Sequence, residues 1–103
     1  MADHSVTLTY LGATFTADPN PVLVKNGETI SFSLNAPPNT TFRVTMTQPE
    51  FFSAAVVNNL NNRVTLVKTL SGPTPFHCQL LGPDGVVVFE STETQPGGVV
   101  RPG

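Results

Sequence analysis

Two adjacent residues, His77 and Cys78, carry the side chains best suited to chemistry in this sequence. A thiolate and an imidazole are copper ligands, and a histidine can also act as a base beside a nucleophile. Both residues lie in a run of alternating apolar and polar side chains, where neighbours point to opposite faces of a strand. We therefore expect Cys78 to be a small buried side chain and His77 to be exposed, so that they cannot ligate one ion together.

Met46 is a further soft ligand that the same pattern brings into consideration. It alternates with polar residues in the run from Phe42 and is expected to face the core, where its sulfur would approach Cys78. A cysteine and a methionine alone make a poor copper site, because the known geometry also requires imidazoles. Cys78, His77 and Met46 are the candidate metal ligands in the body of the chain.

The amino terminus offers a different set of metal ligands. If Met1 is removed, the chain begins Ala2-Asp3-His4. A free amine, two deprotonated amides and the imidazole of His4 would then form a square-planar nitrogen set suited to Cu(II) or Ni(II). Acetylation of the amine would abolish that site.

Phe51 and Phe52 form the one adjacent pair of aromatic residues. Together with the alanines and valines that follow, they are a candidate contact patch for a partner. The alternative is that one ring closes an end of the core, and this alternative is favoured.

The elements that must position these residues are strands, because the dominant hydrophobic period is two. Apolar residues alternate with Thr, Ser, Arg, His or Gln in four segments. These segments are 6–10, 30–34, 42–46 and 76–80. Further strands are expected at 22–24 and 64–70, and the apolar run 86–89 predicts a strand buried on both faces.

Turn residues separate these strands. Asn26-Gly27 predicts a hairpin between 22–25 and 29–34, and Pro83-Asp84-Gly85 predicts another between 75–81 and 86–90. The segment 48–55 begins with Gln-Pro-Glu and predicts a short helical turn. Residues 1–90 then form a single sandwich domain of about seven or eight strands, and the Gly/Pro-rich residues 91–103 are expected to be a flexible tail.

Composition limits the range of partners and compartments. Charged residues make up 12% of the chain and the formal net charge is −2, which gives no basic surface for nucleic acid. The single cysteine excludes an internal disulfide, and no apolar run is long enough to insert into a membrane. The low charge slightly favours a secreted or periplasmic mature domain over a cytoplasmic protein.

Two segments resemble the blue-copper, or cupredoxin, family. The segment 21–32 is similar to the paired strands that open its Greek key, and Gly72 to Cys78 is similar to the strand that carries its thiolate ligand. The resemblance implies an all-β, Greek-key sandwich of the cupredoxin type, with an immunoglobulin-like sandwich as the alternative. It does not imply copper electron transfer, because Thr40 or Thr41, Gln79 to Leu81, and Gly85 or Val86 stand where the other three ligands belong.

These observations together predict a non-catalytic binding or structural module that contacts another protein or itself and has no cofactor. One alternative is a metal-binding or copper-handling protein that uses Cys78 and Met46 or the terminal Ala2-Asp3-His4 set. A second alternative is a small enzyme whose site forms only in the fold. That reading gains if His77 or Cys78 lines a cleft with a carboxylate within hydrogen-bond reach.

Overall fold

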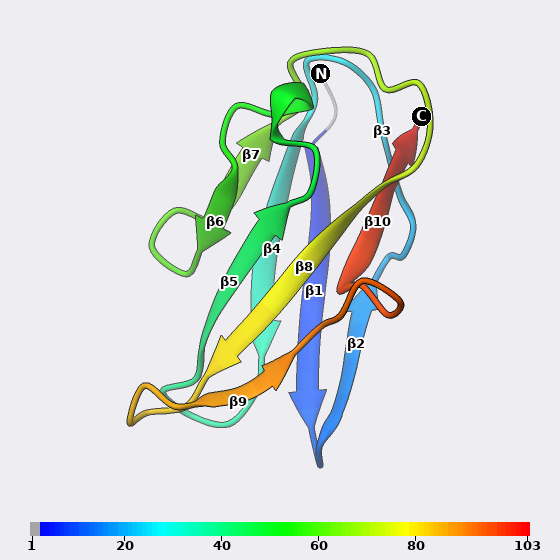
Figure 1. The fold of residues 1–103 in the computed structure, drawn as a ribbon. Helices are drawn as coiled ribbons and strands as arrows, with labels where there is room; N and C mark the ends of the chain where they lie inside the picture. The colour runs from blue at the N-terminus through cyan, green and yellow to red at the C-terminus, as the bar shows by residue number, and fades with distance from the viewer. Residues whose placement is uncertain (1–2) are drawn as a thin grey trace.

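The structure, a computed structural model, describes residues 3–103. These residues form ten strands and one short 3-10 helix (Figure 1). The elements in chain order are β1 Asp3–Leu11, β2 Thr14–Asp18, β3 Val22–Val24, β4 Thr29–Asn35, β5 Thr41–Met46, η1 Pro49–Phe51, β6 Val56–Asn58, β7 Arg63–Thr65, β8 Thr74–Leu81, β9 Val87–Glu90 and β10 Gly98–Pro102. The prediction of an all-β sandwich is confirmed, with more strands than the turn spacing indicated.

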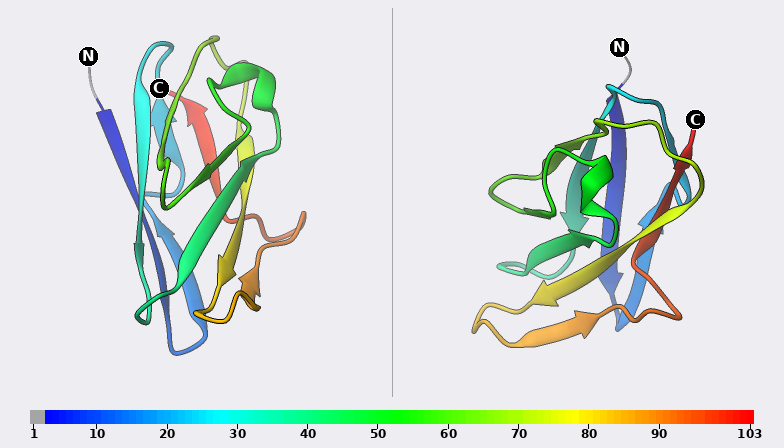
Figure 2. Two further views of the ribbon diagram at one scale, coloured as in Figure 1. Left: turned by 90° about the vertical axis from the view of Figure 1, so that its left-hand side faces the viewer. Right: turned by 45° about the horizontal axis from the view of Figure 1, so that its top comes forward.

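The strands form two mixed sheets that lie face to face, as the two views of Figure 2 show. The first sheet has the order β2-β1-β4-β7. The second has the order β3-β10-β8-β5-β6, and β9 also pairs with β8. Within them β1 runs parallel to β4 and β10 runs parallel to β3, whereas the other pairs are antiparallel.

Alternation along the strands places one set of side chains between the sheets. The core contains Val6 and Leu8 of β1, Ile30 and Phe32 of β4, Val44 and Met46 of β5, and Phe76, Cys78 and Leu80 of β8. Phe32 of the first sheet meets Phe76 of the second edge to face, with ring centroids 5.4 Å apart. The period-two pattern therefore identified the core face of these four strands correctly.

The turn at Asn26-Gly27 does not close a hairpin. Gly27 has a φ of 92°, and the Glu28 N–H donates to the Lys25 carbonyl over 3.0 Å, so the chain does reverse here. However, β3 belongs to the second sheet and β4 to the first. The turn carries the chain from one layer to the other, and the predicted pairing of the two strands is wrong.

The other two local predictions are confirmed. β8 and β9 pair antiparallel around Pro83-Asp84-Gly85, where the Gly82 N–H donates to the Val86 carbonyl over 2.9 Å. The short helical turn expected in 48–55 is η1, which ends when the Phe52 N–H donates to the Pro49 carbonyl.

The valines of the β8–β9 hairpin are not buried. Val86, Val87 and Val88 are 59%, 45% and 45% exposed, and only Phe89 turns partly inward. The expectation that 86–89 is covered on both faces is therefore wrong, because β9 lies on the outside of the fold and pairs with β8 alone. Phe89 stacks on Phe15 with ring centroids 4.4 Å apart.

Residues 98–102 are not part of a flexible tail. They form β10, which lies between β8 and β3 in the second sheet, and the side chain of Val100 is fully buried. Gly98 lies opposite Phe76, and a Cβ there would come within 2.4 Å of the Phe76 ring. The two glycines that suggested disorder instead allow β10 to approach β8 closely. The sandwich domain therefore extends to the last strand.

Residues 3–103 contain no helix with the length and apolar character needed to cross a bilayer.

Candidate functional site

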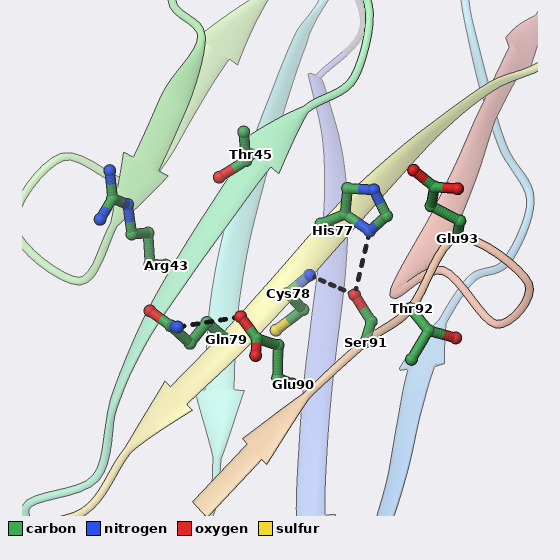
Figure 3. Close-up of a pocket in the computed structure, with 9 residues that line it drawn as sticks. All are labelled: Arg43, Thr45, His77, Cys78, Gln79, Glu90, Ser91, Thr92 and Glu93. Carbon is green, nitrogen blue, oxygen red and sulfur yellow. Dashed lines mark hydrogen bonds between the residues drawn. The ribbon is translucent and has the colours of Figure 1, made fainter. Parts of the chain in front are cut away.

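The best-defined hollow lies on the outer face of the second sheet, at the middle of β5 and β8 (Figure 3). Arg43 lies opposite Gln79 and Thr45 lies opposite His77. The residues between them, Val44 and Cys78, are buried in the core. The alternation of side chains along a strand therefore directs four side chains outward, where they form the floor of the hollow: Arg43, Thr45, His77 and Gln79.

The segment that follows β9 forms the wall of the hollow. β5 pairs with one edge of β8, so β9 and β10 share the other edge, β9 at 79–81 and β10 at 74–76. Between them the chain leaves the sheet and returns at Gly97, whose N–H donates to the Phe76 carbonyl over 2.9 Å. We call this segment, 91–97, the excursion. It forms one wall of the hollow, beside His77 and Cys78.

Ser91 fixes the start of the excursion. Its N–H donates to the Cys78 carbonyl over 2.9 Å, and its hydroxyl accepts the Cys78 N–H over 2.8 Å. The same hydroxyl lies 3.4 Å from Nδ1 of His77. A serine side chain thus takes the place of a strand partner for the Cys78 amide, which would otherwise lose a hydrogen bond in the middle of the sheet.

The hollow has a volume of about 450 Å³, and most of the residues that line it are polar or charged. Its side chains are those of Arg43, Thr45, His77, Gln79, Glu90, Ser91, Thr92 and Glu93, together with part of Cys78. Gln79 donates from Nε2 to Oε2 of Glu90 over 3.1 Å and so ties the floor to the wall. A second hollow of about 390 Å³ lies on the other side of 90–92, against Phe15 and Phe89.

His77 and Cys78 lie as the alternation predicts, on opposite faces of β8. His77 is partly buried on the outer face, whereas Cys78 is 1% exposed in the core. Burial raises the pKa of the Cys78 thiol to about 12, because the thiolate would lose its hydration. The prediction that Cys78 is a small buried side chain is confirmed.

Met46 is also buried and faces the core, but it lies opposite Phe76, and Cys78 lies opposite Val44. Thr41, one of the two positions where the cupredoxin resemblance would place a histidine, lies opposite Leu81. Within residues 3–103 there is no cluster of three or more His, Cys, Asp or Glu side chains that could hold a metal ion. The structure does not bring the candidate core ligands together as a set.

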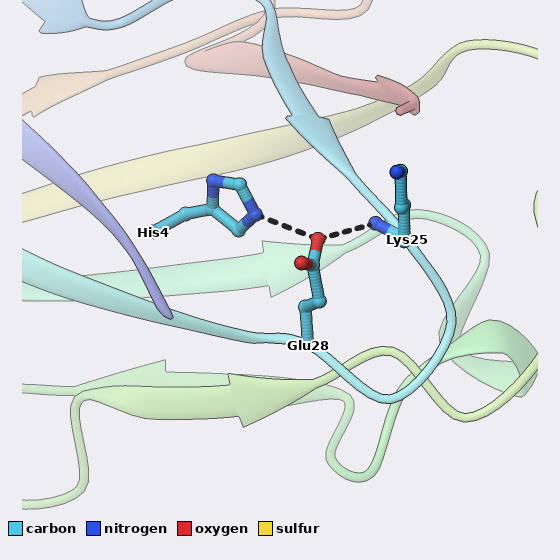
Figure 4. Close-up of polar contacts among 3 residues, drawn as sticks. All are labelled: His4, Lys25 and Glu28. Atoms are coloured by element: carbon cyan, nitrogen blue, oxygen red, sulfur yellow. Dashed lines mark hydrogen bonds and ion pairs between the residues drawn. The ribbon is translucent and has the colours of Figure 1, made fainter. Parts of the chain in front are cut away.

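His4 makes a contact that the sequence did not indicate (Figure 4). Its Nε2 lies 2.8 Å from Oε1 of Glu28, and the same oxygen accepts the Lys25 N–H over 2.8 Å. His4 is the second residue of β1 and lies opposite Ile30. Ala2, whose amine would complete the proposed terminal metal site, lies outside the described residues.

Phe51 and Phe52 do not form an exposed patch. Phe52 is 5% exposed and its backbone bridges to Leu66, while Phe51 packs partly against the same core. The pair is therefore not an exposed contact patch, because Phe52 belongs to the core. The Phe52 side chain packs in the core of the sandwich, and the Phe51 side chain packs partly against it.

Chemically, the hollow is equipped to bind polar groups. The Ser91 hydroxyl lies beside an imidazole, but among the described residues no carboxylate hydrogen-bonds to His77, as a serine–histidine–acid triad would require. Sequence reasoning missed Ser91, Thr92 and Glu93 because 91–103 was taken as a tail, and it placed Glu90 at the end of a predicted strand without assigning it to a site. No model of a known protein family matches the chain, and no curated protein is similar to it.

Proposed function

We propose that this chain is a non-catalytic binding or structural module that contacts another protein or a second copy of itself through β9. The observation that carries the proposal is the exposure of three consecutive valines, Val86 just before β9 and Val87 and Val88 within it. Seven of the other valines are buried in the core, and Val67, 49% exposed, lies apart from this run. An apolar run left on the surface of a folded domain is typical of a contact surface.

The backbone of β9 supports the same proposal. β9 pairs with β8 along one edge, and on the other the Val88 carbonyl accepts the Tyr10 hydroxyl over 3.0 Å. Within residues 3–103 no further strand covers that second edge. A strand with unpaired backbone groups and β-branched side chains is suited to pairing with an added strand.

Charged residues flank the valines and limit what can pair there. Asp84 lies in the hairpin turn, where its Oδ1 accepts the Val86 N–H over 3.1 Å, and Glu90 ends the strand. Leu11, 51% exposed, follows Tyr10 at the same end of the molecule and extends the apolar surface. The favoured partner is therefore a short apolar strand without acidic residues at its centre.

Sedimentation equilibrium and an NMR titration test the proposal together. A synthetic peptide with the sequence of residues 85–91 serves as the strand probe. We expect either concentration-dependent dimerisation of the protein or amide shift changes confined to β9 on adding the peptide. Val87→Thr should weaken either response several-fold, whereas Leu23→Thr, on the exposed face of β3, should leave it unchanged. A protein that stays monomeric and ignores the peptide would refute the role of β9.

We also propose that the sandwich is of the cupredoxin-like, Greek-key type without a copper centre. The parallel pairing of β1 with β4, and a cysteine in a strand that leads into a hairpin, support this assignment. An experimental structure superposed on blue-copper proteins would test it. A strand order that fits an immunoglobulin domain better would contradict it.

A further inference from the structure

The hollow on the outer face of β5 and β8 carries opposite charges on opposite sides. Figure 3 shows the Arg43 guanidinium at one side and the Glu93 carboxylate at the other, with His77 between them. Neither side chain forms an ion pair or a side-chain hydrogen bond within residues 3–103. Glu90, in contrast, is held by Gln79. The hollow therefore carries one cation, Arg43, and two carboxylates, of which Glu93 forms no hydrogen bond or ion pair among the described residues.

Neutral hydrogen-bonding groups lie between Arg43 and Glu93. Thr45 supplies a hydroxyl, and His77 supplies Nε2, because its Nδ1 faces Ser91. No Phe, Tyr or Trp side chain lines the hollow among the described residues, and the imidazole of His77 is the one aromatic ring in the lining. These features favour a flexible polar ligand over an aromatic one.

We propose that this hollow binds a small zwitterion, with its carboxylate on Arg43 and its ammonium group on Glu93. A guanidinium binds a carboxylate through two parallel hydrogen bonds, which gives it a preference for this anion. A volume of about 450 Å³ lies in the range of sites for small molecules. An aliphatic amino acid with separated charges, or a short peptide with free termini, has the required chemistry.

The wall that carries Glu93 is held in place before any ligand arrives. Ser91 is bonded to both the N–H and the carbonyl of Cys78, and the far end of the excursion is bonded to β8 at Phe76. Within the excursion the Thr92 hydroxyl accepts the Gln95 N–H over 3.0 Å. A preformed wall reduces the entropy lost on binding. This site is separate from the β9 edge, so either proposal can fail without the other.

The test is an NMR titration with a series of zwitterions of increasing length. Glycine, 4-aminobutyrate, 6-aminohexanoate and triglycine are compared with hexanoate and hexylamine, which each lack one charge. We expect saturable shift changes at the amides of Thr45, His77 and Thr92, strongest for the member whose length matches the hollow. Hexanoate and hexylamine should bind more weakly, and raising the salt concentration should weaken every interaction.

Two pairs of variants assign the charges. Arg43→Gln and Glu93→Gln should each weaken the best zwitterion about fivefold, which corresponds to about 1 kcal/mol for an exposed ion pair. Arg101→Gln and Glu50→Gln remove equivalent exposed charges elsewhere and should change nothing. All four side chains are exposed, so the fold should be retained, and circular dichroism checks this. The proposal is overturned if no zwitterion shifts these amides, or if hexanoate binds as well as 6-aminohexanoate.

Discussion

At the middle of β8 the hydroxyl group of Ser91 accepts a backbone hydrogen bond that a neighbouring strand would accept elsewhere in the sheet. It accepts the Cys78 N–H over 2.8 Å, while the Ser91 N–H donates to the Cys78 carbonyl. Cys78 therefore keeps its backbone hydrogen bonds although β9 has ended and β10 has not begun. The seven residues 91–97 can therefore lie outside the strands without leaving the buried amide of Cys78 unpaired.

Glu28 plays a comparable part at the other end of the molecule. Its contact with the His4 imidazole, and then the Lys25 N–H, hold the pKa of its carboxyl below the ordinary value of 4.5. The carboxylate thereby links β1 to the turn that carries the chain between the sheets. Because the native state favours the ionised form, this group stabilises the fold above the unfolded pKa and ceases to do so as the pH falls through the lower, folded pKa.

The first prediction is that Glu28→Gln removes part of the acid sensitivity of the protein. The variant should unfold more easily than the wild type at about pH 6, and the difference between them should shrink as the pH falls through the lowered pKa of the wild-type carboxyl. Urea unfolding at several pH values measures this. Glu50→Gln, an exposed carboxyl in η1, serves as the control. Parallel pH profiles for Glu28→Gln and the wild type would contradict the role of Glu28.

At the scale of elements, β10 is positioned by its glycines. A Cβ at Gly98 would lie 2.4 Å from the Phe76 ring, and one at Gly97 would lie 2.8 Å from Cβ of Cys78. Phe76 cannot move away easily, because its ring is buried and meets Phe32 across the sandwich. The close approach of β10 to β8 thus depends on the absence of side chains at these two positions.

Gly98→Ala should accordingly destabilise the protein by about 1 to 3 kcal/mol, the usual cost of overfilling a packed core. Gly72→Ala is the matched control, because no atom lies within 4 Å of a Cβ there, and its effect should stay within about 0.5 kcal/mol. Urea unfolding measures both. If the clash with the ring is the cause, Phe76→Leu combined with Gly98→Ala should cost less than the sum of the two single changes.

At the scale of the whole molecule, the first and last strands both lie inside a sheet. β1 is flanked by β2 and β4, and β10 is flanked by β8 and β3. β3 has no other strand partner within residues 3–103. The two mixed sheets are therefore closed by pairings between segments far apart in the sequence.

A chain that lacks residues 97–103 should fail to fold. It loses the buried Val100 and both ladders of β10, and it leaves β3 unpaired. We expect loss of the cooperative urea transition and of the β-sheet signal in circular dichroism. A chain that lacks only Gly103, whose N–H donates to the Val24 carbonyl, should lose about 1 kcal/mol and remain folded. A folded, cooperative protein without 97–103 would show that the tail assignment was right.

How far the sequence predicts this fold depends on the range of the interaction concerned. Alternation is local, so it identified the inward faces of β1, β4, β5 and β8. The Asn26-Gly27 turn was found, but the same turn can close a hairpin or cross between sheets, and only distant strands decide which. The run 86–89 is apolar enough for a buried strand, and its exposure follows from its place outside β8.

The candidate site was only half predictable for the same reason. His77 and Gln79 were assigned to the polar face of their strand, which is the floor of the hollow. The wall could not be foreseen, because a Gly/Pro-rich segment gives no periodic signal and its position depends on where β9 stops and β10 starts. The hydrogen bond that the Cys78 N–H donates to the Ser91 hydroxyl is a tertiary contact, and the spacing of residues in the sequence does not reveal it.

The position of β10 also bears on how the protein is made. Synthesis proceeds from β1 to β10, so for most of that time β3 and the amino-terminal end of β8 have no partner on the side that β10 will occupy. The second sheet is completed only when residues 98–102 have left the ribosome. Until then the nascent chain carries open strand edges, which neighbouring nascent chains or chaperones can engage. The glycines at 97 and 98 let the last strand fit between β8 and β3, and so allow these two edges to be covered once β10 is made.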